Sequence, residues 1–270
     1  DYSDHHFRGW YFDAEKFLKA WKKKSDHQSR REMIFDAETK KFHADLPGIC
    51  SGFLDRWEEV IIQKRDGHDR FPAEESLLFQ TGLLNRPVVD EIAQCFGQII
   101  CEELNTALPK PKSYLALTWD IDSAGFWYRP AMASNVRRVI RDCGWGVVPK
   151  LIHSAMETKS DVQKDPHMRY QYILDCLRPS ESKCTWFVQT IKKHKVDNYQ
   201  LSHAKRLIRC LEKVIRDHHE IGLHTSYATY ANQSDFSSLN LQALELSKIF
   251  NEPGYISVGH RAHYLRHAPR

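Results

Sequence analysis

The sequence predicts an α/β protein with two domains, a mostly helical one over residues 1–110 and an α/β one over residues 111–270. Two observations predict this organisation. The segment Ala107-Leu-Pro-Lys-Pro111 interrupts a helical pattern and is typical of a linker. After the linker, strand-like runs and helical patterns alternate strictly, which favours a parallel sheet or a (β/α) barrel.

Three apolar patterns of helical spacing define the first domain, at residues 14–21, 53–61 and 87–104. The last begins at Pro87, a residue suited to the first turn of a helix. Residues 65–71 between the second and third patterns are polar and typical of turns. No part of this domain carries obvious chemistry.

The second domain is expected to contain four strands, at residues 113–118, 184–189, 220–224 and 255–264, the last with its exit loop. Helices are expected at residues 136–143, 170–177, 204–215 and 239–250, with an irregular surface insertion at residues 145–168. A complete (β/α) barrel has eight strands. We therefore expect a barrel that is truncated at its C-terminus within this chain.

Charge and cysteine content narrow the choice of partners and compartment. The formal net charge of +4 over 270 residues is too small to predict nucleic acid as the main partner. No apolar run approaches the roughly 20 residues that span a bilayer. The seven cysteines are odd in number and lack Cys-x-x-Cys spacing. Because Cys95, Cys101, Cys184 and Cys210 lie in apolar patterns, we expect core thiols in a reducing compartment, and hence a cytoplasmic protein. The oligomeric state is not predicted. The chain begins with Asp1 rather than Met, so we expect a fragment of a longer protein.

The stretch that carries the chemistry is Leu115-Ala-Leu-Thr-Trp-Asp-Ile-Asp122. Alternation along a strand places Asp120 and Asp122 on the same face, near the strand end. Two carboxylates this close repel unless a cation or a shared proton lies between them. The pair predicts a metal or acid/base site, although a strand followed by an Asx turn explains the same residues.

Polar residues also stand at the expected ends of the other three strands. They are Gln189, His224 and, after the last strand, Arg261 and His263. Working residues gather at the carboxyl ends of strands in parallel α/β folds, and a divalent ion explains why carboxylates and imidazoles meet there. His219 lies five residues before His224, at the other end of its strand, so we interpret it as structural.

Four motifs occur in a recognisable order: Thr118-Trp-Asp-Ile-Asp122, Thr185-Trp-Phe187, His219-Glu-Ile-Gly-Leu-His224-Thr-Ser-Tyr227 and Arg261-Ala-His-Tyr-Leu-Arg266. Together they resemble the polysaccharide deacetylases, the NodB-homology group of carbohydrate esterase family 4. The similarity is greatest to a bacterial branch that carries a domain of uncharacterised function ahead of the deacetylase domain. Asp66-Gly-His-Asp-Arg-Phe71 and Arg86-Pro-Val-Val-Asp90 resemble the end of that domain, so the resemblance covers residues 50–266.

The resemblance implies a distorted (β/α) barrel that binds a divalent metal, usually zinc, and hydrolyses the N-acetyl group of an amino sugar in a polysaccharide or glycan. It implies that Asp120 is the general base, that Arg261 orients it, and that Asp122 and His224 bind the metal. In the general chemistry of such sites a carboxylate takes a proton from the attacking water, while the metal stabilises the developing oxyanion.

Three departures from the family pattern matter. The second motif has Ala228 where the family has a second histidine, so the third ligand is absent or comes from elsewhere. We expect His263, with Tyr227 or Ser226 as weaker alternatives. Trp119 stands where this branch often has histidine, and it either stacks on a sugar ring or packs on the barrel. The family's later motifs, with the catalytic-acid histidine, do not occur before Arg270, so we expect metal binding but incomplete catalysis.

The predicted substrate contacts are Trp119, Tyr227 and Tyr264. Two other functions remain open. A haloacid-dehalogenase-type phosphatase also has Asp-x-Asp at a strand end, but its pattern requires Thr or Val where this chain has Ala124. A non-catalytic carbohydrate-binding or scaffolding relative with a decayed metal site is favoured by Ala228.

Overall fold

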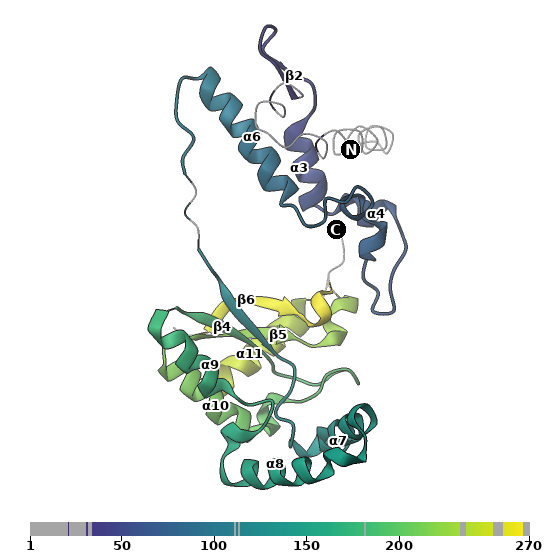
Figure 1. Cartoon of the computed structure of the whole chain (residues 1–270), viewed down its shortest axis with the longest axis vertical. Helices are drawn as coiled ribbons and strands as arrows, with labels where there is room; N and C mark the ends of the chain where they lie inside the picture. The colour runs from purple at the N-terminus through teal and green to yellow at the C-terminus, as the bar shows by residue number, and fades with distance from the viewer. Residues whose placement is uncertain are drawn as a thin grey trace. The chain divides into compact units, whose positions relative to one another are not determined.

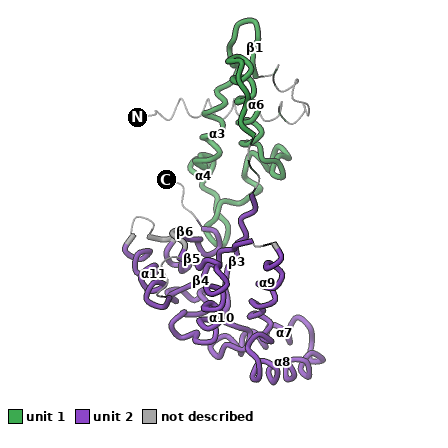
Figure 2. The backbone as a smooth tube through the Cα atoms, turned by 90° about the vertical axis from the view of Figure 1, so that its left-hand side faces the viewer, with its two compact units in different colours: residues 1–113, 269–270 green, residues 114–268 purple. Residues whose placement is uncertain are grey.

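The computed structural model describes residues 21, 31, 34–110, 112, 114–180, 182–232, 236–250 and 256–266. The chain forms two compact units, Asp1–Ser113 with Pro269–Arg270, and Tyr114–Ala268 (Figure 2). The division falls beside the Pro-containing segment that the sequence marks as a linker. The helix expected at residues 14–21 lies outside the described residues except for Trp21, which is helical and buried.

The first unit is built on helices, with one short hairpin. Its helices are α3 (Leu46–Leu54), α4 (Trp57–Ile61), α5 (Leu77–Gln80) and α6 (Val88–Glu103), and β1 (Phe35–Asp36) pairs antiparallel with β2 (Lys41–Phe42). The single helix expected at residues 53–61 is wrong. The chain breaks between α3 and α4 because Arg56 adopts a left-handed conformation, with φ of 58°. The apolar pattern continues across this break, so spacing alone does not reveal it.

The second unit contains a four-stranded parallel sheet in the order β3-β4-β5-β6. Its strands are β3 (Leu117–Ile121), β4 (Cys184–Gln189), β5 (Glu220–Thr225) and β6 (Ile256–Ala262). The mixed α/β class is as predicted, and sequential parallel order is the order of strands in the wall of a barrel. The strand expected at residues 113–118 is displaced: β3 runs from Leu117 to Ile121, and Tyr114 and Leu115 are exposed ahead of it. Asp120 therefore lies inside the strand, and Asp122 directly follows it.

Five helices accompany the sheet in the described part of this unit. They are α7 (Arg129–Cys143), α8 (Val148–Ser160), α9 (Tyr170–Leu177), α10 (Lys205–Arg216) and α11 (Phe236–Ile249). The irregular insertion expected at residues 145–168 is wrong, because most of it is α8. Pro149 begins this helix in its first turn, and Thr158 is its one buried residue, so the helix lacks the apolar stripe that sequence patterns detect.

The two faces of the sheet differ in character. The apolar face carries Ile121, Trp186, Val188, Ile221 and Leu223, which pack with α9, α10 and α11 into one core (Figure 1). Residues between them in sequence alternate to the opposite face. In the described residues that face carries Thr118, Asp120, Phe187, Gln189, His224 and Arg261. The polar side chains of the four strand ends thus share one side of the sheet.

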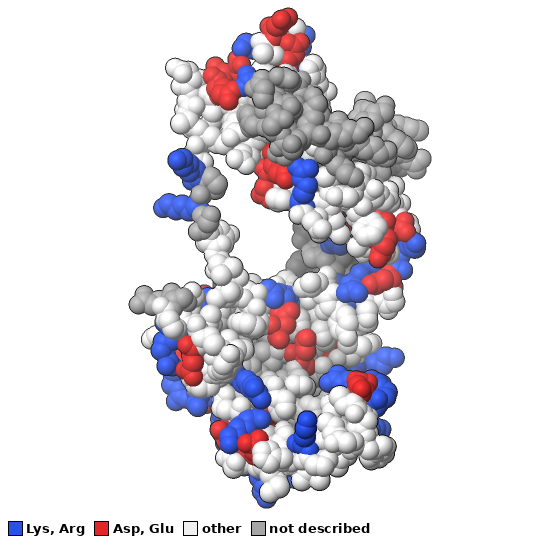
Figure 3. All heavy atoms as spheres, viewed as in Figure 1, with Lys and Arg blue, Asp and Glu red and all other residues white. Residues whose placement is uncertain are grey.

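Three general features complete the fold. None of the helices in the described part of the chain combines the length and apolarity needed to cross a bilayer. All seven cysteines are free thiols. On the face drawn in Figure 3, acidic and basic side chains are interspersed rather than gathered into one extended patch.

Candidate metal centre at the carboxyl ends of the strands

Three residues from three strand ends converge on one point. Asp122 follows β3, His224 lies in β5, and His263 follows β6. The Nε2 atom of His224 lies 3.2 Å from Oδ1 of Asp122, and that of His263 lies 3.8 Å from the same oxygen. One ligand atom of each residue lies within 4.8 Å of the other two. The two imidazoles are buried, whereas the side chain of Asp122 is 59% exposed, so the cluster is open on the carboxylate side.

The second nitrogen of each imidazole is already engaged. Nδ1 of His224 lies 3.0 Å from the carbonyl oxygen of Arg261, and Nδ1 of His263 lies 3.2 Å from Oδ1 of Asp197. Because a carbonyl and a carboxylate oxygen accept, Nδ1 is the donor in both contacts. Each Nε2 atom is thereby left facing Asp122, and in the neutral imidazole its lone pair is available to a ligand. This is the arrangement that orients histidines at metal centres.

Asp197, which the sequence analysis did not single out, accepts hydrogen bonds from several residues around the cluster. Its carboxylate is fully buried and accepts hydrogen bonds from Ser226 Oγ (2.6 Å), the Tyr227 amide (2.9 Å) and His263. It also accepts from the amides of Lys193 and His194. Burial raises the pKa of Asp197, but the hydrogen bonds from His263 and Ser226 outweigh it and hold the pKa well below its ordinary value. Asp197 therefore stays anionic beneath His263.

The two residues after Asp197 hydrogen-bond to the backbone at the end of β3. Asn198 donates from Nδ2 to the Asp122 carbonyl at 2.8 Å. The Tyr199 hydroxyl donates to the Ile121 carbonyl at 2.8 Å and accepts from the Gln189 amide at 3.1 Å. The loop after β4 thus fixes Asp122 and His263 together. The sequence signal for this loop is the polar pair Asp197-Asn198, which follows the carboxyl end of β4.

Beside the cluster, Asp120 is held by Arg261. The guanidinium donates to Asp120 Oδ1 and to Thr118 Oγ1, both at 2.8 Å, and stacks 4.5 Å above the centre of the Phe187 ring. The Phe187 ring lies over Gly222, where an added Cβ would come within 2.6 Å of the ring. Gly222, the glycine of the second motif, therefore leaves space for the Phe187 ring on which Arg261 stacks.

Asp122 and His224 shift one another's protonation. The hydrogen bond from His224 lowers the pKa of Asp122 despite the opposing effect of burial. Burial lowers the pKa of His224, but the hydrogen bond to Asp122 and the charge of Asp120 raise it above its ordinary value. Without an ion the pair tends to share a proton, and a cation would replace that proton.

The predicted substrate contacts divide into two groups. Tyr227 and Tyr264 lie beside the cluster, with their ring centres 6.1 Å and 5.0 Å from that of His263. Tyr264 is partly exposed and has a φ of 60°, a strained conformation for a tyrosine. Trp119 instead stacks on Trp186, 5.8 Å away, on the apolar side of the sheet. The structure therefore does not bring Trp119 together with the other candidates, and it favours the packing interpretation.

Comparison with known proteins bears on the first unit. Residues 4–105 match the model of a family of unknown function (DUF7033). This segment covers most of the helical unit and none of the candidate metal centre. No curated protein and no solved structure matches the chain.

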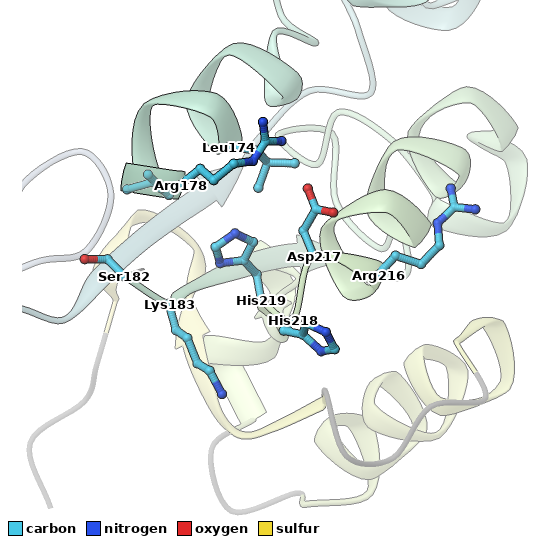
Figure 4. Close-up of a pocket in the computed structure, with 9 residues that line it drawn as sticks. Leu174, Arg178, Ser182, Lys183, Arg216, Asp217, His218 and His219 are labelled. Atoms are coloured by element: carbon cyan, nitrogen blue, oxygen red, sulfur yellow. The ribbon is translucent and has the colours of Figure 1, made fainter. Parts of the chain in front are cut away.

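A separate pocket of about 350 Å³ lies at the opposite ends of the strands (Figure 4). It is lined by exposed basic residues, among them Arg178, Lys183 and Arg216, and by His219. His219 is buried, and its Nδ1 accepts from the Cys184 amide at 3.2 Å. As the sequence suggests, His219 lies apart from His224 and has a structural partner.

Proposed function

We propose that the second unit is a metal-dependent hydrolase of the polysaccharide deacetylase type, which removes the N-acetyl group from an amino sugar. The single observation that supports this most strongly is the open triangle of Asp122, His224 and His263 beside the Asp120–Arg261 pair. The strand-end motifs resemble those of the family in the same order. The barrel of that family and its zinc ion are part of the proposal.

The donor set fits a catalytic zinc ion. Two imidazoles and one carboxylate are three protein ligands, and an open fourth position is typical of catalytic zinc sites. Magnesium and calcium prefer oxygen ligands, so the two imidazoles disfavour these ions. They thereby also disfavour a magnesium-dependent phosphatase of the haloacid-dehalogenase type. Asp197 and the Arg261 carbonyl supply the outer hydrogen bonds that such histidines require. His263 thereby replaces the histidine that is missing at Ala228.

Each residue has a definable task in the proposed reaction. A divalent ion bound there would polarise the amide carbonyl and lower the pKa of water. Asp120 takes the proton of the attacking water, since Arg261 orients its carboxylate, and this proton passes to the amine that leaves as the C–N bond breaks. Tyr227 and Tyr264 are placed to pack against a sugar ring beside His263. The open side of the cluster at Asp122 is where substrate enters.

The proposal is tested on the purified chain, stripped of metal and reloaded with zinc. We expect one zinc ion per chain by elemental analysis, and slow release of acetate from an N-acetylated amino-sugar oligomer, because the sequence predicts incomplete catalysis. Asp122→Asn and His263→Gln should lose the ion. The control is His218→Gln, because this exposed histidine lines the pocket at the opposite ends of the strands.

Each alternative has its own outcome. Zinc bound without acetate release supports the non-catalytic carbohydrate-binding relative. Release of phosphate from a phosphate monoester, with magnesium required, supports the phosphatase. Failure of the wild-type chain to retain zinc at pH 7 to 8 contradicts the proposal.

A further inference from the structure

Gln189 is a buried residue whose side chain lacks partners. The residue is 1% exposed, and neither Oε1 nor Nε2 has a hydrogen-bond partner among the described residues. Its backbone amide is satisfied by the Tyr199 hydroxyl. Leaving a buried amide side chain unpaired is unfavourable, so such a group in a native structure requires an explanation, such as a water molecule, an ion or a ligand that it binds.

The position of Gln189 points to the candidate metal centre. Strand β4 lies between β3 and β5, and Gln189 is paired in register with His224. Val188 pairs with Ile121, so Asp122 lies level with Gln189 on the other side. The contact between Asp122 and His224 therefore crosses β4 at the level of Gln189.

The direction of the side chain follows from alternation along β4. Val188 belongs to the apolar core, and Phe187 carries the Arg261 guanidinium on the opposite face. Gln189 is two residues after Phe187 and therefore faces the same side as Asp120, Asp122 and His224. An unpaired amide thus lies on the same face of the sheet, and at the same level, as the cluster that the proposed function uses.

We propose that Gln189 binds the substrate, with Nε2 donating a hydrogen bond to the carbonyl oxygen of the acyl amide held beside Asp122. This rests on the proposed function and deepens it. A neutral amide suits this side chain, because a carboxamide offers both a donor and an acceptor without a charge. A donor aimed at this oxygen also stabilises the negative charge that develops on it during hydrolysis.

Gln242 supplies a matched control, because it is equally buried but fully paired. Its Oε1 accepts from the Ser226 amide, and its Nε2 donates to Thr229 Oγ1 and the Ser238 carbonyl. We compare Gln189→Met with Gln242→Met in the metal-free and zinc-loaded chain. The melting temperature, the zinc content and the binding of acetamide, followed by NMR titration, are measured for each, together with acetate release.

Gln189→Met should raise the melting temperature by about 2–4 °C, since it removes an unpaired buried polar group, whereas Gln242→Met should lower it. Zinc content should stay the same in Gln189→Met. Acetamide should bind about 5–10-fold more weakly, the effect of one lost hydrogen bond. Turnover of an N-acetylated oligomer should fall by about 10²–10³, as on removal of an oxyanion donor.

Three results overturn the inference: loss of zinc, which makes Gln189 a metal ligand; a melting temperature that falls as in Gln242→Met; or unchanged acetamide binding. Failure of the proposed function is recognised separately, as a wild-type chain that retains no zinc or releases no acetate. In that case the acetamide affinities of the wild type and Gln189→Met, measured on the same samples, still decide whether Gln189 contacts an amide ligand.

Discussion

The two ends of β5 each carry a buried histidine, and the two residues have opposite surroundings. At the amino end, His219 accepts from a backbone amide, and burial lowers its pKa. At the carboxyl end, His224 donates to the Arg261 carbonyl and faces a carboxylate, which raises its pKa despite burial. An imidazole that accepts from a backbone amide, as His219 does, stabilises the fold. An imidazole whose Nδ1 donates to a carbonyl, as in His224, presents its Nε2 atom to a ligand.

Substituting each histidine in turn is the sharpest test of this comparison. His224→Gln should reduce zinc affinity by more than about 100-fold, beyond the effect of losing an outer-sphere partner. His219→Gln should leave zinc affinity unchanged but destabilise the chain by about 1–3 kcal/mol, since the Cys184 amide loses its acceptor. Zinc titration and thermal unfolding of both variants measure this. Equal zinc affinity in the two variants would remove the distinction between the ends.

Two carboxylates at opposite ends of the sheet, those of Asp120 and Glu220, are compared next. Asp120→Asn should retain zinc but lower turnover by about 10²–10⁴, the usual contribution of a general base. Glu220→Gln is its counterpart, because Glu220 begins β5 and accepts from Thr185 Oγ1 at 2.8 Å on the exposed surface. That variant should keep full turnover. Near-normal acetate release by Asp120→Asn would exclude Asp120 from the mechanism.

Asp197 extends the comparison to the partners of the histidines. Asp197→Asn should weaken zinc binding about 10–100-fold, because His263 loses the acceptor that fixes its orientation. Asp165→Asn is the control, since Asp165 is also buried but accepts from the backbone amides of Phe126 and Trp127. It should lower stability without changing zinc affinity. The same loss of affinity in both variants would show that general stability, rather than His263, is responsible.

Gly222, in the middle of β5, tests whether the strand must leave space for the site. Gly222→Ala should destabilise the unit by about 1–3 kcal/mol through overpacking against Phe187, and should lower turnover by displacing Arg261. Gly146→Ala is the control, because a Cβ there meets nothing within 4 Å. Thermal unfolding and acetate release are measured on both. Unchanged stability and turnover in Gly222→Ala would show that the position of the Phe187 ring does not matter for Arg261.

The smallest expected effect is a difference in pH dependence of the metal-free chain. The raised pKa of His224 contributes stability that is complete below about pH 6.5 and is lost as the pH rises through its folded pKa. The lowered pKa of His219 contributes stability that is present above about pH 6.5 and is lost as the pH falls through its folded pKa. His224→Gln should flatten the loss above pH 6.5, and His219→Gln the loss below it. Unfolding in urea between pH 5 and 8 measures both slopes.

Much of the second unit could be predicted from its sequence. The strands at residues 184–189 and 220–224 and the helix at residues 170–177 carry strong apolar patterns, and each lies within one residue of the structure. The start of β3 was misplaced because Tyr114 and Leu115 are apolar yet exposed. Helix α8 was missed because a helix exposed on most sides has no apolar stripe.

For the site, sequence reasoning identified residues whose type carries chemistry at the expected strand ends. Asp122, His224 and His263 meet in the structure, and Arg261 holds Asp120. Asp197 was missed because its role depends on a loop that folds back under His263, 66 residues away. For Trp119 the sequence left both stacking on a sugar ring and packing on the barrel open. Strand alternation places Trp119 on the face opposite Asp120 and favours packing.

The edge position of β3 has a dynamic consequence. Among the described strands β3 lies at one edge of the sheet and pairs with β4 alone, so its amides should exchange with solvent by local opening more readily than those of β4. An ion shared by Asp122, His224 and His263 would tie this outer strand to β5 and β6 across β4. Opening would then require release of the ion, and occupancy would slow exchange in β3 far more than in β4. Amide exchange at residues 117–121 thus becomes a direct readout of the metal centre.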